Sequence, residues 1–207
     1  PAFMRAEEVV QLGYDELQHI NQVMLNFFVR PGDDTRTLLR FYLVGEKAWT
    51  LDLASPPVQR FISLLKRKGT VVDPTLAVFE FYVQKQGELL PTYAAVADHF
   101  PVVVQRNLRS NGSDVNEKNA EPFRRSYDKL LAMVARMYKA GIPLVAGTDT
   151  LAAFTLHREL ELYVKAGIPA AEALKIATWN GAKYTRTLDR LGSITPGKLA
   201  DLVLVDG

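Results

Sequence analysis

The chain has 207 residues, of which 48% are hydrophobic and 23% charged, with a formal net charge of +2. This length can bury a substantial core as one large domain or two small ones. The nearly balanced charge gives no electrostatic reason to expect binding to nucleic acid or to a membrane surface. The lack of cysteine excludes disulfides and thiolate metal ligands, so a metal would need histidine, aspartate, glutamate or a modified lysine.

The ends of the chain carry no targeting signal that we recognise. No apolar run approaches the ~20 residues of a transmembrane helix, and the first residues lack the basic segment and apolar core of a signal peptide. Position 1 is proline rather than methionine. We therefore expect a soluble protein of unknown compartment, and a chain that begins inside a longer protein.

One layout of helix, glycine, short strand and polar residue occurs three times. The helices are expected over residues 6–12, 55–67 and 121–140, and the strands over residues 15–18, 70–73 and 142–149. The glycines that end the helices are Gly13, Gly69 and Gly141, and the polar residues that end the strands are His19, Asp73 and Asp149. Glycine suits the left-handed position after a helix. This alternation predicts βαβ units and a parallel sheet.

The third unit contains the most informative stretch, residues 142–149, which read I-P-L-V-A-G-T-D. It predicts a short, fully buried strand that presents the carboxylate of Asp149 at its C-terminal end. In parallel α/β proteins, chemistry is carried at that end of the strands. Asp149 is explained equally well as the N-cap of the next helix.

Two long excursions, residues 22–52 and 74–122, follow the first two strand ends. Each could cover a pocket as a lid, or serve as a structural insertion or oligomer contact. The second contains Arg106 and Arg109, beside a polar loop over residues 109–114. These arginines could meet an anionic substrate group, although nothing in their spacing requires it.

The last part of the chain predicts further helices and then a strand. The helix after Asp149 is expected to place one apolar face inward, formed by Leu156, Leu160, Tyr163 and Val164. Another helix follows Pro169. The apolar run over residues 200–205 predicts a strand of a separate small β-sheet.

The polar residues allow several interpretations. An imidazole at His19 and a carboxylate at Asp149, on the same rim of a parallel sheet, can converge on a divalent metal. The alternative for His19 is a polar loop residue. Asp73 precedes a helical stretch and is explained well as an N-cap. His157 could contact substrate, or form a solvated helical pair with Glu161.

The motifs of several other enzyme classes are missing. The sequence has no glycine-rich phosphate loop, no Gly-x-Ser-x-Gly elbow and no thiol nucleophile. Metal-assisted hydrolysis is the chemistry that the available residues contradict least.

An ordered series of motifs in the last third of the chain is similar to a known family. The series runs through G-T-D at residues 147–149, L-H-R-E-L at 156–160, A-G-I-P-A-A-E-A-L at 166–174, A-T-W-N-G-A at 177–182, L-G-S-I at 191–194 and P-G-K-L-A-D-L-V-L at 196–204. It resembles the C-terminal part of the amidohydrolase superfamily, in particular its imidazolonepropionase-like and prolidase-like members.

The resemblance implies an α/β fold, namely the C-terminal part of a (β/α)8 TIM barrel. Residues 1–190 would hold strands 6 to 8 and their helices, and residues 191–207 the start of a small flanking β-sandwich. It also implies an enzyme that hydrolyses a C–N bond in a small-molecule amide or cyclic amide, with one or two divalent ions, expected to be Zn²⁺. His19 would be a metal ligand, and Asp149 a metal ligand and general base.

The departures from the family matter equally. The first-strand His-x-His pair, the fourth-strand lysine and the fifth-strand histidine of the family are not found in this sequence. Three αβ units cannot close an eight-stranded barrel. We therefore expect a C-terminal fragment without activity of its own, associated with itself or with a missing N-terminal half. The alternative is a non-catalytic half-barrel that binds or self-associates.

Overall fold

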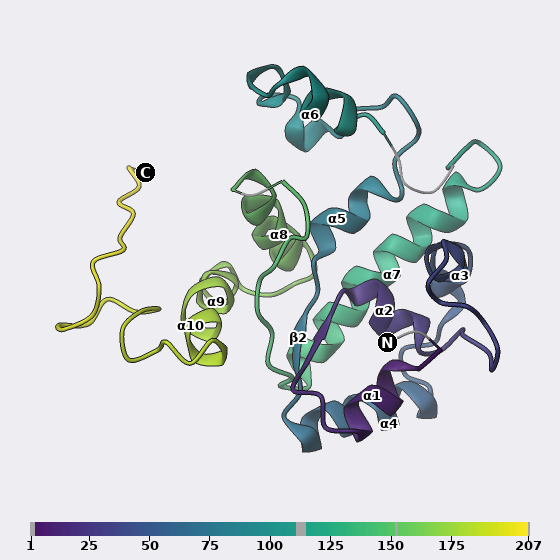
Figure 1. Cartoon of the computed structure of the whole chain (residues 1–207), viewed down its shortest axis with the longest axis horizontal. Coiled ribbons are helices and arrows are strands. Elements are labelled where there is room, and N and C mark those ends of the chain that lie inside the picture. Colours follow the sequence, from purple (N-terminus) through teal and green to yellow (C-terminus); the bar gives the residue numbers. More distant parts are fainter. Residues whose placement is uncertain (1–2, 111–114, 152, 207) are drawn as a thin grey trace.

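A computed structural model describes residues 3–110, 115–151 and 153–206 of the chain (Figure 1). The α-helices are α1 (Ala6–Gln11), α2 (Ile20–Leu25), α3 (Leu39–Lys47), α4 (Pro56–Lys68), α5 (Leu76–Phe81), α6 (Val102–Asn107), α7 (Ala120–Lys139), α8 (Phe154–Lys165), α9 (Ala170–Lys175) and α10 (Gly181–Tyr184). The strands are β1 (Glu16–Gln18) and β2 (Val71–Asp73). Short 3-10 turns lie at Ala48–Thr50, Pro91–Tyr93 and Ala97–His99, and a π-helical turn at Ile176–Asn180. Most of the predicted polar loop, residues 111–114, lies outside the described residues.

The sheet is parallel, as the repeated layout predicts. β1 pairs with β2 in parallel, with Leu17 opposite Val72. On its other side, Val72 forms a parallel bridge to Leu144. The three segments therefore lie side by side in chain order, which confirms the α/β prediction.

The third segment is shorter and less buried than predicted. Its ladder consists of the Val72 N–H donating to Pro143 O (2.9 Å) and the Val145 N–H donating to Val72 O (3.1 Å). Ile142 and Leu144 are buried, but residues 145–148 are half-buried and Asp149 is exposed. The prediction of a fully buried strand is wrong in this respect, because the segment has a partner on one side only among the described residues.

Helices α1, α4 and α7 begin and end close to the predicted positions, and the expected glycines end them. Gly13, Gly69 and Gly141 have φ angles of 95°, 65° and 76°. These angles are easy for glycine and strained for residues with a Cβ. After each glycine the chain turns back toward the sheet, so the three short segments run in the same direction.

The core lies between the sheet and the long helices. α4 buries Val58, Phe61, Ile62 and Leu65, and α7, the longest helix, lies beside β2 in Figure 1. The first excursion places α3 against α7. The second forms a small separate cluster around Tyr93, Ala97 and Leu108, and carries α6 beyond the end of α5 (Figure 1).

Helix α8 forms where predicted, but a different face is buried. Its buried residues are Thr155, Glu159, Leu162 and Tyr163. Leu156 and Val164 are exposed by 37% and 45%, so the predicted apolar face is wrong except at Tyr163 and, in part, Leu160. The reason is that Glu159 turns inward to hydrogen-bond α5, which rotates the apolar stripe toward solvent.

The C-terminal tail contains no strand. All residues from 199 to 206 are exposed, and Figure 1 shows the tail leading away from α9 and α10. The predicted strand over residues 200–205 is therefore wrong for this structure. A strand needs a hydrogen-bonding partner, and no described segment pairs with this one. The domain boundary at residue 191 stays a prediction.

None of the described helices is long and apolar enough to cross a membrane.

The packing of α3 on α7 can be tested at Gly45. A Cβ at this position would lie 2.7 Å from Cδ1 of the buried Phe123 ring. We predict that Gly45→Ala lowers the free energy of unfolding by about 1–3 kcal/mol, because a core ring would have to move. Gly181→Ala is the control, since a Cβ there meets nothing within 4 Å. Urea denaturation would show equal stability of the two variants if this packing were incorrect.

Candidate metal centre

Three residues with strained backbones stand at the ends of the three parallel segments. His19, Thr75 and Asp149 have φ angles of 69°, 48° and 49°. A residue other than glycine with a positive φ angle destabilises the fold by on the order of 1–3 kcal/mol. Such strained residues are found most often at functional sites. The three strained positions therefore mark one rim of the sheet.

The structure brings His19 and Asp149 together, as predicted. Nε2 of His19 lies 3.7 Å from Oδ2 of Asp149. Nδ1 of His19 lies 2.9 Å from the Thr75 hydroxyl, in a hydrogen bond whose direction follows the imidazole tautomer. When Nδ1 donates to Thr75, Nε2 keeps its lone pair on the side of Asp149. That tautomer suits a metal ligand.

The N-cap interpretation of Asp149 does not apply. The N-cap of α8 is Ala153, four residues further on. The Asp149 side chain is 62% exposed, whereas that of His19 is 27% exposed. Its carboxylate is therefore accessible to water and faces the imidazole.

Asp73, at the end of β2, has a structural role. Its Oδ1 accepts a hydrogen bond from the Gly147 N–H (2.8 Å), and burial raises the pKa of this carboxyl group. A Cβ on Gly147 would lie 2.8 Å from Cγ of Asp73, so only glycine allows this approach. The N-cap interpretation of Asp73 is wrong, because the N-cap of α5 is Thr75.

Glu159 binds the first turn of α5 instead. The Leu76 N–H donates to Oε1 (2.9 Å) and the Ala77 N–H to Oε2 (2.7 Å). Glu159 is fully buried, and this burial raises its pKa to about 8, although the two N–H donors act in the opposite direction. Sequence patterns missed Glu159, since an acidic residue on an amphipathic helix is normally expected to face solvent.

Two further hydrogen bonds connect the third parallel segment, around Leu144, to the C-terminal helices. The Tyr163 hydroxyl donates to Val145 O (2.8 Å), and the Asn180 side-chain amide donates to Leu144 O (2.8 Å). These bonds satisfy carbonyl groups of a segment that has little strand pairing. They explain why a one-bridge strand can still present Asp149 in a defined place.

The remaining predicted residues do not reach this rim. His157 is exposed on α8, in a groove with Leu160 and Leu174, and its expected partner Glu161 is bound by Arg158 (2.7 Å). Arg106 is exposed on α6. The Arg109 guanidinium donates to Gln105 O (3.3 Å). The substrate roles of His157, Arg106 and Arg109 stay predictions.

A cavity of about 600 Å³ opens beside His19, along the outer edge of β1. Gln18, Gln22, Arg36 and Arg40 line it together with His19. The guanidinium of Arg40 donates to the carbonyl groups of Thr35 and Arg36 (both 3.2 Å). The cavity could admit a polar small molecule next to the imidazole.

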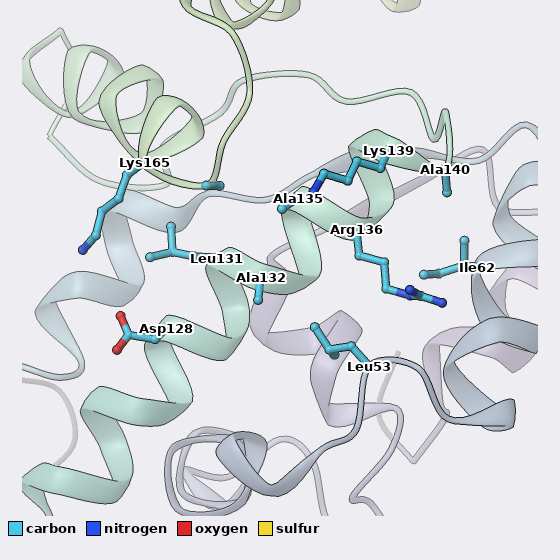
Figure 2. A pocket seen from close by; sticks show the side chains of 11 residues that line it. Leu53, Ile62, Asp128, Leu131, Ala132, Ala135, Arg136, Lys139, Ala140 and Lys165 are labelled. Carbon is cyan, nitrogen blue, oxygen red and sulfur yellow. The ribbon is translucent and has the colours of Figure 1, made fainter.

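A larger cavity of about 790 Å³ lies elsewhere, on the outer face of α7. In Figure 2, Arg136 points toward Ile62 and Leu53, whereas Lys165 extends from the opposite side. Its charged groups do not converge on one point. This cavity is therefore a surface trough between helices, without the chemistry of the His19 rim.

The donors of His19 and Asp149 fit a divalent ion in kind and in spacing. Imidazole nitrogen and carboxylate oxygen are both zinc ligands, and two ligands of one tetrahedral ion lie about 3.3 Å apart. Their observed separation of 3.7 Å needs little adjustment. In the described part of the chain, no group of three or more such side chains could hold a metal. Two donors alone do not make a metal site, so the ligand roles of His19 and Asp149 stay a prediction.

Comparison with known proteins decides the family. The sequence model described as "Amidohydrolase family" matches residues 102–207, which is 106 of the 207 residues. The chain belongs to the amidohydrolase family. Amidohydrolases are generally metal-dependent, in agreement with the donor types at the rim.

Two curated proteins are 40% identical to parts of this amidohydrolase chain. One is a 5-methylthioadenosine/S-adenosylhomocysteine deaminase from Thermoanaerobacter pseudethanolicus, matched over 88 residues, 36% of this chain and 20% of that protein. The other is Adenine deaminase 1 from Desulfotalea psychrophila, matched over 62 residues, 30% of this chain and 10% of that protein. The chain thus spans a fifth or less of these relatives.

A solved structure resembles nearly the whole amidohydrolase chain. It is a Xaa-Pro dipeptidase with bound methionine in the active site, with a TM-score of 0.53 and 20% identity. The match covers 94% of this chain and 34% of the dipeptidase chain. Together with the family, this likeness implies a TIM-barrel-like fold.

The buried Glu159 predicts a pH dependence of stability. An unfolded glutamate has a pKa near 4.3, and the folded value is about 8. Between these values the folded protein holds a proton that the unfolded chain releases, so the free energy of unfolding falls as pH rises. We predict a fall of a few kcal/mol between pH 5 and pH 8, since one pKa unit corresponds to about 1.4 kcal/mol.

Urea denaturation at both pH values measures this fall. Glu159→Gln should flatten the dependence, whereas Glu161→Gln, an exposed control on the same helix, should leave it in place. An equally steep fall in the Glu159→Gln variant would contradict the assignment.

Proposed function

We propose that this chain is the C-terminal part of a metal-dependent amidohydrolase that hydrolyses a C–N bond of a small-molecule amide or cyclic amide. The observation that carries the proposal is the pair of His19 and Asp149. They stand 3.7 Å apart on strained backbones, at the C-terminal ends of two parallel segments of one sheet. Membership of the amidohydrolase family supports the reaction class.

In this proposal, β1, β2 and the segment around Leu144 are strands 6, 7 and 8 of a (β/α)8 barrel. Their parallel order along the sheet supports three consecutive barrel strands, and the motifs that follow Asp149 support their place at the C-terminal end of the barrel. The helices that follow them would be α4, α7 and α8. Residues 191–207 would begin the flanking β-sandwich and would gain strand partners there.

The proposed ligands are Nε2 of His19 and Oδ2 of Asp149, with further donors from the strands that precede this chain in the barrel. One or two divalent ions, most simply Zn²⁺, would lower the pKa of a bound water and polarise the scissile bond. Thr75 contacts Nδ1 of His19 and so would leave Nε2 free to bind an ion. This is the usual function of a hydrogen-bond partner behind a histidine ligand.

Asp149 is the proposed general base. Its exposed carboxylate could accept a proton from the attacking water at Oδ1, the oxygen not proposed as a ligand, and then give it to the leaving nitrogen. The deaminase and dipeptidase names of the similar proteins are consistent with C–N hydrolysis.

Metal removal and substitution of Asp149 test the proposal in the full-length protein. We expect dialysis against a chelator to abolish amide hydrolysis and added Zn²⁺ to restore it. Asp149→Asn should lower kcat by about 10²–10⁴-fold, as for loss of a general base. Asp189→Asn, at an exposed position, is the matched control. Full activity after complete metal removal would refute the mechanism.

A second candidate function is a non-catalytic half-barrel that associates with itself or with the N-terminal half. The observation in its favour is the uncovered surface. The outer edge of β1 has no strand partner in the described residues, and Val164 and Leu174 are exposed by 45% and 59% along one groove. Open strand edges and apolar grooves promote association.

Light scattering of the 207-residue chain distinguishes these cases. We predict a dimer or larger assembly, with no hydrolysis and weak zinc binding, because only two of the ligands are present. Replacing the exposed Leu174 by Lys should shift the assembly toward monomer if the α8–α9 groove takes part. A stable monomer of the unmodified chain would argue against association through open edges.

A further inference from the structure

A buried carboxylate crosses from α8 to the first turn of α5. Glu159 is fully buried, and its two oxygens accept the Leu76 and Ala77 N–H groups at 2.9 and 2.7 Å. These N–H groups have no partner within the helix, because the first turn of any helix leaves its donors free. Glu159 therefore fixes the position at which α5 begins.

The residue at that position is the one that holds the proposed metal ligand. Thr75 is the N-cap of α5, with φ 48° and ψ 46°, and its hydroxyl lies 2.9 Å from Nδ1 of His19. Thr75 makes no side-chain cap of its own. Its strained conformation is thus imposed from outside, by the bonds on the two residues that follow it.

Side chains of α7 and α8 also hold the rest of α5 in place. The Tyr127 hydroxyl on α7 donates to Leu76 O (3.2 Å). At the other end, Arg158 binds Glu80 through two bonds of 2.8 and 2.6 Å. A helix of six residues is too short to be stable alone. Adjacent residues of α8, Arg158 and Glu159, therefore hold both ends of α5.

The position of α5 determines more than the Thr75 contact. Phe79 of α5 lies edge-on to the His19 ring, with centroids 6.1 Å apart. An apolar residue at position 159 would avoid the cost of burying a carboxylate, but it could not hold two N–H groups. The retained carboxyl group is explained by the geometry that it imposes.

We propose that Glu159 is a positioning residue for the metal centre: through the Leu76 and Ala77 N–H groups it holds Thr75 where its hydroxyl orients the imidazole of His19. This inference rests on the proposed function for the metal, but the link from Glu159 to His19 can be measured without it. Glu159 itself touches neither the ion nor the substrate.

A double-mutant cycle tests the link in the full-length protein, with Zn²⁺ alone as the probe. We expect Glu159→Gln and Thr75→Val each to weaken zinc binding about tenfold, the lower end for loss of a histidine's hydrogen-bond partner. Because both act through one hydrogen bond, the double variant should bind no more weakly than either single variant. Glu161→Gln, two residues along α8 and exposed, should bind zinc like the unmodified protein. Losses that multiply, or unchanged binding by Glu159→Gln, would overturn the proposal.

Nitrogen NMR of the metal-free protein gives a readout that does not depend on the proposed function. The His19 Nδ1 resonance should move in Glu159→Gln in the same direction as in Thr75→Val, and should stay in place in Glu161→Gln. A His19 signal that Glu159→Gln leaves unmoved would overturn the positioning role, whereas loss of metal dependence alone would overturn only the proposed function.

Amide exchange covers the case in which Glu159→Gln does not fold. In the unmodified protein, zinc binding should slow exchange of the Leu76 and Ala77 amides, since coupling between two sites is reciprocal. This slowing should be smaller in Thr75→Val. Exchange that zinc leaves unchanged in the unmodified protein would overturn the link.

Discussion

The buried carboxylate of Glu159 joins α8 to the first turn of α5, and through Thr75 to His19 at the end of β1. Burying a carboxyl group is costly unless its oxygens find hydrogen-bond partners, because no water can replace a missing partner. Here both oxygens bind backbone N–H groups that the helix could not satisfy itself. The same contact rotates the apolar stripe of α8 outward, so the buried face of the helix follows from it.

The small sheet makes these side-chain bonds necessary. β1 and β2 each have three residues, and the third segment contributes a single bridge. So little pairing does not fix where the chain goes after each strand. The Tyr163 hydroxyl on α8 and the Asn180 amide after α9 each donate a hydrogen bond to the third segment. The hydrogen bond from the Gly147 N–H to Asp73 connects the second segment to the third. The strained residues His19, Thr75 and Asp149 stand where these restraints meet.

The sequence was informative wherever the physics is local. Gly13, Gly69 and Gly141 end helices because their φ angles are positive, and the alternation of helices with short strands predicted a parallel sheet. The motifs after Asp149 led to the correct family. Local patterns failed where a distant partner decides the outcome. The role of Glu159 was missed and Asp73 was interpreted as a cap. The apolar tail over residues 200–205 was predicted to be a strand, although no described segment pairs with it.

By itself, therefore, the sequence determined the order of the elements, the helix ends, the family and the candidate ligands His19 and Asp149. Periodicity, glycine geometry and motif order are properties of neighbouring residues. Only the tertiary structure decided that Nε2 of His19 faces Asp149 at 3.7 Å, that Thr75 stands behind the imidazole, and that Glu159 fixes Thr75. These contacts join residues 56 to 130 positions apart in the chain, and their formation depends on the packing of α5 and α8 against one sheet, which no local pattern encodes.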